Sequence, residues 1–212
     1  MRRLKKPPRR LRVAAIDAID DKGVIVQWGA SAAVKQFRRH FAFWAFRNQK
    51  GRCAYCSLSI GASGHRSSAV DHFVRKGGLG GAPQWTYELY NLVLACERCN
   101  SKLKKVYLAI AEVAIEPYRS NTFTLYHPYL DKLADHIKGG FPGGAAIPTT
   151  PRSLSSKGAA TISLFRLSNP NLRQLWESES QATLDRKRRR DLSTAELERY
   201  ELALRELQGS FR

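Results

Sequence analysis

Residues 53–56 read Cys-Ala-Tyr-Cys, and residues 96–99 read Cys-Glu-Arg-Cys. The chain contains four cysteines, so these two pairs use all of them. A Cys-x-x-Cys pair can place two thiolates on one ion, and two such pairs complete a tetrahedral zinc site. The alternatives are two disulfides or a dithiol redox site, but redox activity requires a thioredoxin-like unit that this sequence lacks. The spacing therefore predicts a structural zinc bound by Cys53, Cys56, Cys96 and Cys99.

Between the two pairs, the runs Ser68–Phe73 and Leu92–Ala95 have the composition of short β-strands. An acidic residue and a histidine lie near the end of the first run, an asparagine precedes the second, and another follows the last cysteine. A zinc with four sulfur ligands has no open coordination position, so we expect the chemistry in a cleft formed by these polar residues. They are Asp71, His72, Asn91 and Asn100.

The net charge indicates the class of partner. Thirty-six lysines and arginines against eighteen acidic residues give a net charge of +18. Such an excess attracts polyanions, and nucleic acid is the commonest of them. An acidic protein or a membrane surface is the alternative, but the sequence has neither a lipidation motif nor a basic amphipathic anchor. We therefore expect a nucleic-acid partner.

The hydropathy pattern gives no sign of a membrane protein. No apolar run is long enough to span a bilayer, and no apolar run follows the basic residues at the N-terminus. We expect a cytoplasmic protein with reduced thiols.

The N-terminal flank combines a basic arm with a helix. Residues 1–12 carry seven basic residues around Pro7 and Pro8, which favours an extended arm that either follows a phosphate backbone or is solvated. Ser31 can cap the helix that follows, and Gly51 can end it. Its aromatic stripe is typical of a core face rather than a base-stacking surface. The stripe consists of Val34, Phe37, Phe41 and Trp44.

The C-terminal flank contains three predicted elements. Thr161–Leu167 alternates loosely, as a strand does. Asn169 and Pro170 read as a cap and a first helical residue. Ser193 and Glu196 form a capping box for a last helix.

Together these residues resemble the His-Asn-His (HNH) endonucleases that carry a four-cysteine zinc. The resemblance covers about a quarter of the chain, and its elements occur in the family's order. They are Cys53-Ala-Tyr-Cys56, Asp71-His72, Asn91-Leu-Val-Leu-Ala-Cys96-Glu-Arg-Cys99-Asn100 and Lys102.

The resemblance implies an α+β fold, in which a ββα-metal (HNH) finger with its structural zinc is flanked by mainly helical segments. We predict a basic arm and N-terminal helix over residues 1–50, the nuclease core over 51–110, and a mainly helical C-terminal region over 111–212.

The resemblance also implies a role for each polar residue of the cleft. His72 matches the general base, and Asp71 matches the acidic metal ligand beside it. Asn91 matches the central asparagine, which fixes the loop and helps to orient the base. Asn100 stands where the family usually has a second histidine ligand, as in an H-N-N variant. An amide oxygen is a harder ligand than imidazole, so it favours magnesium or manganese.

These residue types suit phosphodiester hydrolysis in DNA. An imidazole with a pKa near neutrality can deprotonate the attacking water. A divalent ion on Asp71 and Asn100 can neutralise the phosphoryl oxygens and stabilise the leaving oxygen. Arg75, Lys76 and Lys102 are near enough in sequence to bind phosphates, although a solvated role is open for each.

A second resemblance concerns biological role. The segment His127-Pro128-Tyr129 and residues 157–175 are similar to the tails of HNH nucleases from bacterial phage-defence systems of the Septu type. This similarity implies antiviral defence with an ATPase partner. The rival hypothesis is a zinc-stapled nucleic-acid-binding module without turnover. Such a module would need neither a base nor a metal-ligating acid beside it.

Overall fold

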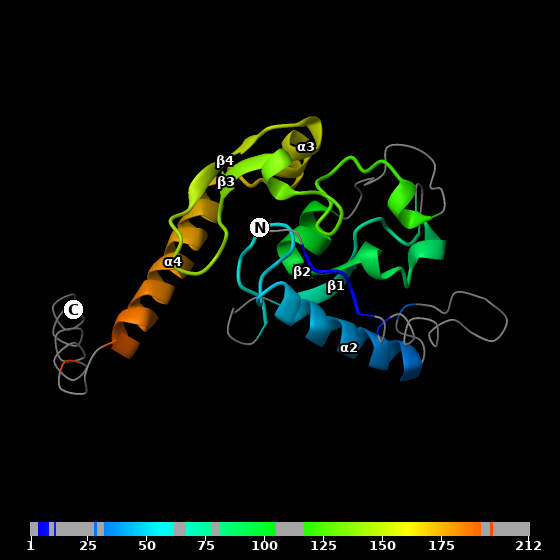
Figure 1. Cartoon of the computed structure of the whole chain (residues 1–212), viewed down its shortest axis with the longest axis horizontal. Coiled ribbons are helices and arrows are strands. Elements are labelled where there is room, and N and C mark those ends of the chain that lie inside the picture. Colours follow the sequence, from blue (N-terminus) through cyan, green and yellow to red (C-terminus); the bar gives the residue numbers. More distant parts are fainter. Residues whose placement is uncertain are drawn as a thin grey trace.

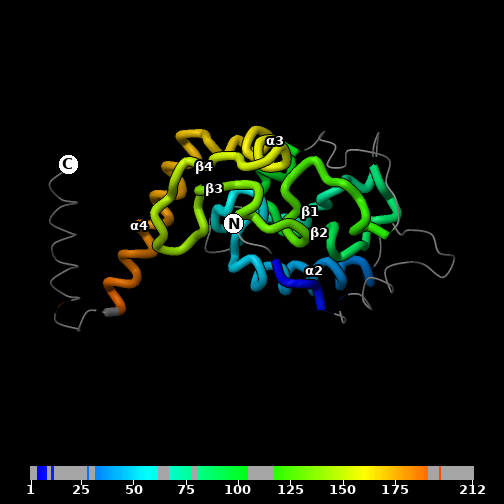
Figure 2. The backbone as a smooth tube through the Cα atoms, turned by 45° about the horizontal axis from the view of Figure 1, so that its top comes forward, coloured from blue at the N-terminus to red at the C-terminus, as the bar shows by residue number. Residues whose placement is uncertain are grey.

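The computed structural model describes residues 4–8, 11, 28, 32–61, 67–77, 81–104, 117–191 and 196. This part of the chain has an α+β fold with two separate antiparallel strand pairs, β1–β2 and β3–β4. In Figures 1 and 2, α2 lies on one side of β1–β2, and α3 lies with β3–β4 on the other. The helices α2, α3 and α4 span Ala32–Asn48, Ser156–Phe165 and Pro170–Asp191. The strands β1 to β4 span Ser68–His72, Leu92–Cys96, Ile137–Gly140 and Thr149–Ser153.

The predicted N-terminal helix is confirmed as α2, which packs against both β1 and β2. Its stripe forms core as expected, because Val34, Phe37 and Phe41 are buried, whereas Trp44 is only partly buried. The helix ends at Asn48, before the predicted stop. The proposed cap Ser31 lies outside the described residues.

The chain changes direction directly after the end of α2. Lys50 adopts the left-handed conformation, with φ of 55°. The Lys50 N–H donates to the Arg47 carbonyl at 3.2 Å, and the Gly51 N–H donates to the Phe46 carbonyl at 2.8 Å. These two bonds form a Schellman motif, which satisfies carbonyls that the helix end would otherwise leave unpaired.

The strands β1 and β2 pair antiparallel, with Asp71 opposite Val93. Every residue of β2 is buried. The Gln49 side chain holds the other edge of β2, because its amide donates to the Leu94 carbonyl and accepts from the Leu94 N–H, both at 2.8 Å. A short π-helical turn, η3 (Arg98–Leu103), follows β2 directly.

The C-terminal region differs from the prediction in two respects. The strand pair β3–β4 was not predicted. The strand prediction for Thr161–Leu167 was wrong, because most of that segment belongs to α3. The Ser155 hydroxyl caps α3 by accepting from the Gly158 N–H at 3.1 Å. Gly158 also allows a close approach, since a Cβ atom there would collide with the His136 carbonyl.

The predicted start of α4 is confirmed, since Pro170 is its first residue and the Asn169 side chain accepts from the Asn171 N–H at 2.8 Å. The last predicted helix lies outside the described residues, except for Glu196. No helix in the described part of the chain is long and apolar enough to cross a membrane.

Two side chains of α4 contact the segment that carries the first cysteine pair. The Trp176 indole N–H donates to the Cys56 carbonyl at 2.8 Å. The Glu179 carboxylate accepts from the Ser59 N–H at 3.0 Å and from the Arg52 guanidinium at 3.1 Å. The helix therefore holds the turn that follows the pair.

Residues 4–8 of the basic arm are docked against the rest of the structure. The Leu4 N–H donates to the Pro128 carbonyl at 2.8 Å, and Lys5 exchanges two hydrogen bonds of 3.2 Å with the Asn48 side chain.

Candidate functional site

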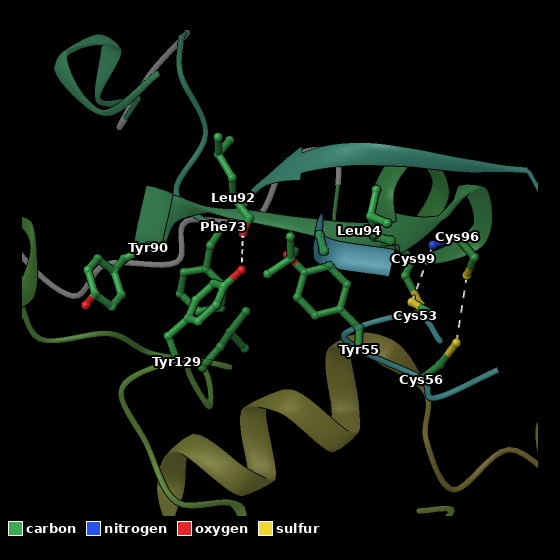
Figure 3. Close-up of a cluster of buried hydrophobic side chains, with 14 of the residues drawn as sticks. Cys53, Tyr55, Cys56, Phe73, Tyr90, Leu92, Leu94, Cys96, Cys99 and Tyr129 are labelled. Atoms are coloured by element: carbon green, nitrogen blue, oxygen red, sulfur yellow. Dashed lines mark hydrogen bonds between the residues drawn. The ribbon is translucent and has the colours of Figure 1, made fainter. Parts of the chain in front are cut away.

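The four cysteines form one compact cluster beneath the end of β2 (Figure 3). Their sulfur atoms all lie within 4.8 Å of one another, and all four are buried free thiols. Hydrogen bonding to Cys53, and then to Cys96, raises the pKa of the Cys56 thiol. The prediction of a four-cysteine metal site is therefore confirmed at the level of geometry, and this set of donors fits one tetrahedral ion.

Local backbone hydrogen bonds shape the first cysteine pair into a tight turn. The Cys53 N–H donates to the Leu58 carbonyl at 2.9 Å, and the Ser57 N–H donates to the Cys53 carbonyl at 3.1 Å. The Cys96 N–H points at the Cys53 sulfur, 3.4 Å away, so the two pairs already face each other. This is the geometry in which backbone donors support a thiolate.

Tyr55, which lies between the first two cysteines, connects the cluster to the acidic residue. Its hydroxyl donates to Asp71 Oδ2, and its ring stacks on Phe165 of α3 with centroids 4.3 Å apart. Burial, followed by the charge of Asp71, raises the pKa of Tyr55. Tyr55 was not predicted as a site residue, although it lies within the first Cys-x-x-Cys pair.

Asp71 is buried and forms an ion pair with Lys104. The Lys104 ammonium lies 2.9 Å from Oδ1 and 2.7 Å from Oδ2, and it also donates to the His72 carbonyl. The two side chains are 6% and 7% exposed, so the pair is shielded from water. Lys104 was not among the predicted site residues.

Asn100 and Lys102 lie on η3, one turn or less before Lys104. Asn100 is partly buried and Lys102 is exposed. Among the described residues, no hydrogen bond joins Asn100 to Asp71. The structure thus places the Lys104 ammonium, rather than the expected amide oxygen of Asn100, at the Asp71 carboxylate.

His72 is oriented by a backbone carbonyl. Its Nε2 lies 3.0 Å from the Thr86 carbonyl oxygen, which only accepts, so Nε2 carries the proton and Nδ1 is the basic nitrogen of the neutral ring. Burial, with nearby Lys76 and Lys104 adding to it, lowers the pKa of His72 to about 4. The expectation of a pKa near neutrality is therefore wrong, because desolvation disfavours the imidazolium.

Asn91 fixes the loop between β1 and β2. Its Oδ1 accepts from the Val74 N–H at 2.6 Å, and its Nδ2 donates to the carbonyls of Val74 and Trp85, both at 3.0 Å. Thr86, whose carbonyl holds His72, directly follows Trp85. These contacts hold the loop through one side chain; the role of Asn91 in orienting the base stays a prediction.

A buried network supports Asn91 from the C-terminal region. The His127 Nδ1 accepts from the N–H groups of Tyr129 and Leu130, at 3.2 and 3.3 Å. Nε2 therefore carries the proton and donates to the Tyr118 hydroxyl at 2.9 Å, and that hydroxyl donates to Asn91 Oδ1 at 3.2 Å.

The two basic residues after β1 lie differently. The Arg75 guanidinium donates to the Gly77 carbonyl at 2.7 Å and so belongs to its own turn. The exposed Lys76 lies 5.9 Å from the centre of the Trp28 ring, which in turn contacts His72 with ring centroids 4.6 Å apart.

Comparisons of the chain with protein-family models, with curated proteins and with solved structures gave no significant match.

Proposed function

We propose that this chain is an HNH-type endonuclease that hydrolyses phosphodiester bonds in DNA, with His72 as the general base. The observation that supports the proposal is the hydrogen bond between His72 Nε2 and the Thr86 carbonyl, 3.0 Å long, made by the residue that follows Asp71 on β1. A neutral ring held in this way can accept a proton from an attacking water at Nδ1. The ring stays neutral above pH values of about 4, which is the pKa of His72.

Phosphodiester hydrolysis also needs positive charge near the phosphoryl oxygens. Lys76, Lys104 and Arg38 lie close enough to His72 to lower its pKa. A phosphate bound among these cations would reverse their effect, because a negative charge favours the imidazolium. Substrate binding would thus make His72 a stronger base.

We propose zinc for the four-cysteine cluster, where it would hold the two cysteine pairs together without taking part in the chemistry. A divalent ion such as Mg²⁺ or Mn²⁺ on Asp71 and Asn100 is part of the family arrangement. It does not fit beside Lys104, whose ammonium contacts both oxygens of Asp71. A divalent ion at Asp71 therefore requires Lys104 to move away.

The test is incubation of the purified protein with supercoiled plasmid in Mg²⁺ or Mn²⁺. We expect nicked or linear product from the wild type and none from His72→Ala. The matched control is His40→Ala, which removes an exposed histidine from α2 and should leave cleavage unchanged. Equal cleavage by His72→Ala, or no cleavage in any metal, would exclude the proposed enzyme.

The second candidate is a zinc-stapled module that binds nucleic acid without cutting it. The buried ion pair between Asp71 and Lys104 favours this candidate, because it neutralises the acid that a catalytic metal would need. DNA binding without cleavage in the same assay would support it. The ATPase partner and the role in phage defence stay predictions.

A further inference from the structure

A hollow of about 420 Å³ lies between α2 and β1. We call it the α2–β1 groove; α2 contributes Lys35, Arg38, Arg39 and Phe46, and β1 contributes Ser68–Val70. In Figure 1, α2 runs beside β1, on the side of the sheet away from α3.

The groove is cationic and lacks matching acids. The helix α2 contains no aspartate or glutamate. Within the described residues, no carboxylate lies at ion-pair distance from Lys35, Arg38 or Arg39, whereas other cations such as Arg52 are paired. Unpaired cations gathered in a hollow favour an anionic ligand.

Arg38 connects the groove to the general base. Its guanidinium lies 5.3 Å from the centre of the Trp28 ring, and Lys76 lies 5.9 Å from the same ring. The Trp28 ring is 4.6 Å from the ring of His72. Two cations thus share one indole, although each repels the other; burial, followed by the charge of Arg38, lowers the pKa of Lys76. A phosphate between them would remove this repulsion.

We propose that the α2–β1 groove binds the phosphodiester backbone of DNA and leads it past Arg38 to His72. The spacing suits such a ligand. Lys35 to Arg39 spans four residues, or about 6 Å of helix, and successive phosphates of one strand rise about 3.4 Å along the axis. The cations of α2 therefore match about two phosphates beside the one that His72 attacks. This inference rests on the proposed function, because it names the substrate path of the same site.

The test is binding of a short fluorescein-labelled DNA duplex, followed by anisotropy without added Mg²⁺ or Mn²⁺. All proteins carry His72→Ala, so cleavage cannot interfere. Adding Arg38→Gln should weaken binding about tenfold and reduce the slope of log K against log salt by about one. Lys35→Gln, an exposed position on the same helix, should act in the same direction and provides a second variant should Arg38→Gln fail to fold. The matched control Arg152→Gln removes one exposed charge from β4 and should change little.

The outcomes separate this inference from the proposed function. Groove variants that bind like the control would exclude the groove as the substrate path, even if the wild type cleaves plasmid. Weaker binding by the groove variants would support the groove, even if the wild type cleaves nothing. Displacement of DNA by polyglutamate at equal charge concentration would overturn the assignment to a nucleic acid. A labelled RNA duplex that binds more tightly than DNA would overturn the choice of DNA.

Discussion

The ammonium of Lys104 lies 2.9 and 2.7 Å from the two carboxylate oxygens of Asp71, in the position where a metal ion would contact that acid. Removing one partner of a buried ion pair leaves the other charge uncompensated, which costs about 3–5 kcal/mol. We therefore predict that Lys104→Met lowers the midpoint of thermal unfolding.

The same variant should bind a divalent ion more tightly, because Asp71 loses its resident cation. We expect Mn²⁺ binding, measured by electron paramagnetic resonance, to strengthen at least tenfold, and Mn²⁺ to restore much of the lost stability. Lys102→Met is the matched control, since Lys102 is exposed on the same turn and should change neither quantity. Unchanged Mn²⁺ affinity in Lys104→Met would show that the ammonium does not compete with metal.

Substitutions at Asn91 and Tyr118 test how much each side chain contributes to holding the loop between β1 and β2. Asn91→Ala leaves a buried N–H and two carbonyls without their partners, so we expect a loss of about 3 kcal/mol or more in the free energy of unfolding. Tyr118→Phe leaves one buried donor, the Nε2–H of His127, without its acceptor, and should cost less, about 1–2 kcal/mol. Urea unfolding of both variants measures the two losses in the free energy of unfolding. Equal losses would contradict the prediction that Asn91→Ala costs more than Tyr118→Phe.

Burial of His127 predicts a pH-dependent stability. The pKa of His127 falls from 6.5 to about 3, chiefly because of burial. Between these values the unfolded chain binds the proton more strongly, so the free energy of unfolding decreases as the pH falls from about 6.5 to about 3. The contribution of His127 to the free energy of unfolding is on the order of a few kcal/mol, and it is fully present above pH 6.5.

The measurement is urea unfolding of the wild type and His127→Gln at several pH values. Glutamine does not titrate, so the variant should show a shallower dependence on pH in this window. His72 is also buried with a lowered pKa and contributes in the same direction, but it cancels in the comparison. Identical slopes would contradict a neutral His127.

The cysteine cluster predicts about one zinc per chain by elemental analysis. Removal of the metal with a mercurial should unfold the region around it, because four buried thiols would lose the ion that joins them. Cys96→Ser should lose zinc and stability together. Ser101→Ala, an exposed change close to the second cysteine pair, should retain both.

The parts of the fold that were predicted correctly have local signals. The apolar stripe of α2, the Asn169-Pro170 start of α4 and the two Cys-x-x-Cys pairs each lie within a few residues, and all are confirmed. The run Leu92–Ala95 likewise falls within β2.

The errors arise where distant contacts decide the structure. The glycines at 139 and 140 mask the alternation of β3, and both have positive φ. Thr161 and Ile162 favour a strand by residue type, but Ser155 caps a helix there, and Gly158 lets that helix approach the backbone of His136, just before β3. The ion pair of Lys104 with Asp71 spans 33 residues, and no local pattern marks it.

The contacts of α4 limit where this chain can be truncated or grafted. Trp176 and Glu179 hold the turn after the first cysteine pair from a position about 120 residues further along the chain. A fragment that stops at residue 110 would therefore lose the hydrogen bonds from Trp176 and Glu179 that hold the turn after its first cysteine pair. Grafting residues 51–110 into another protein would require the graft to carry α4 with it.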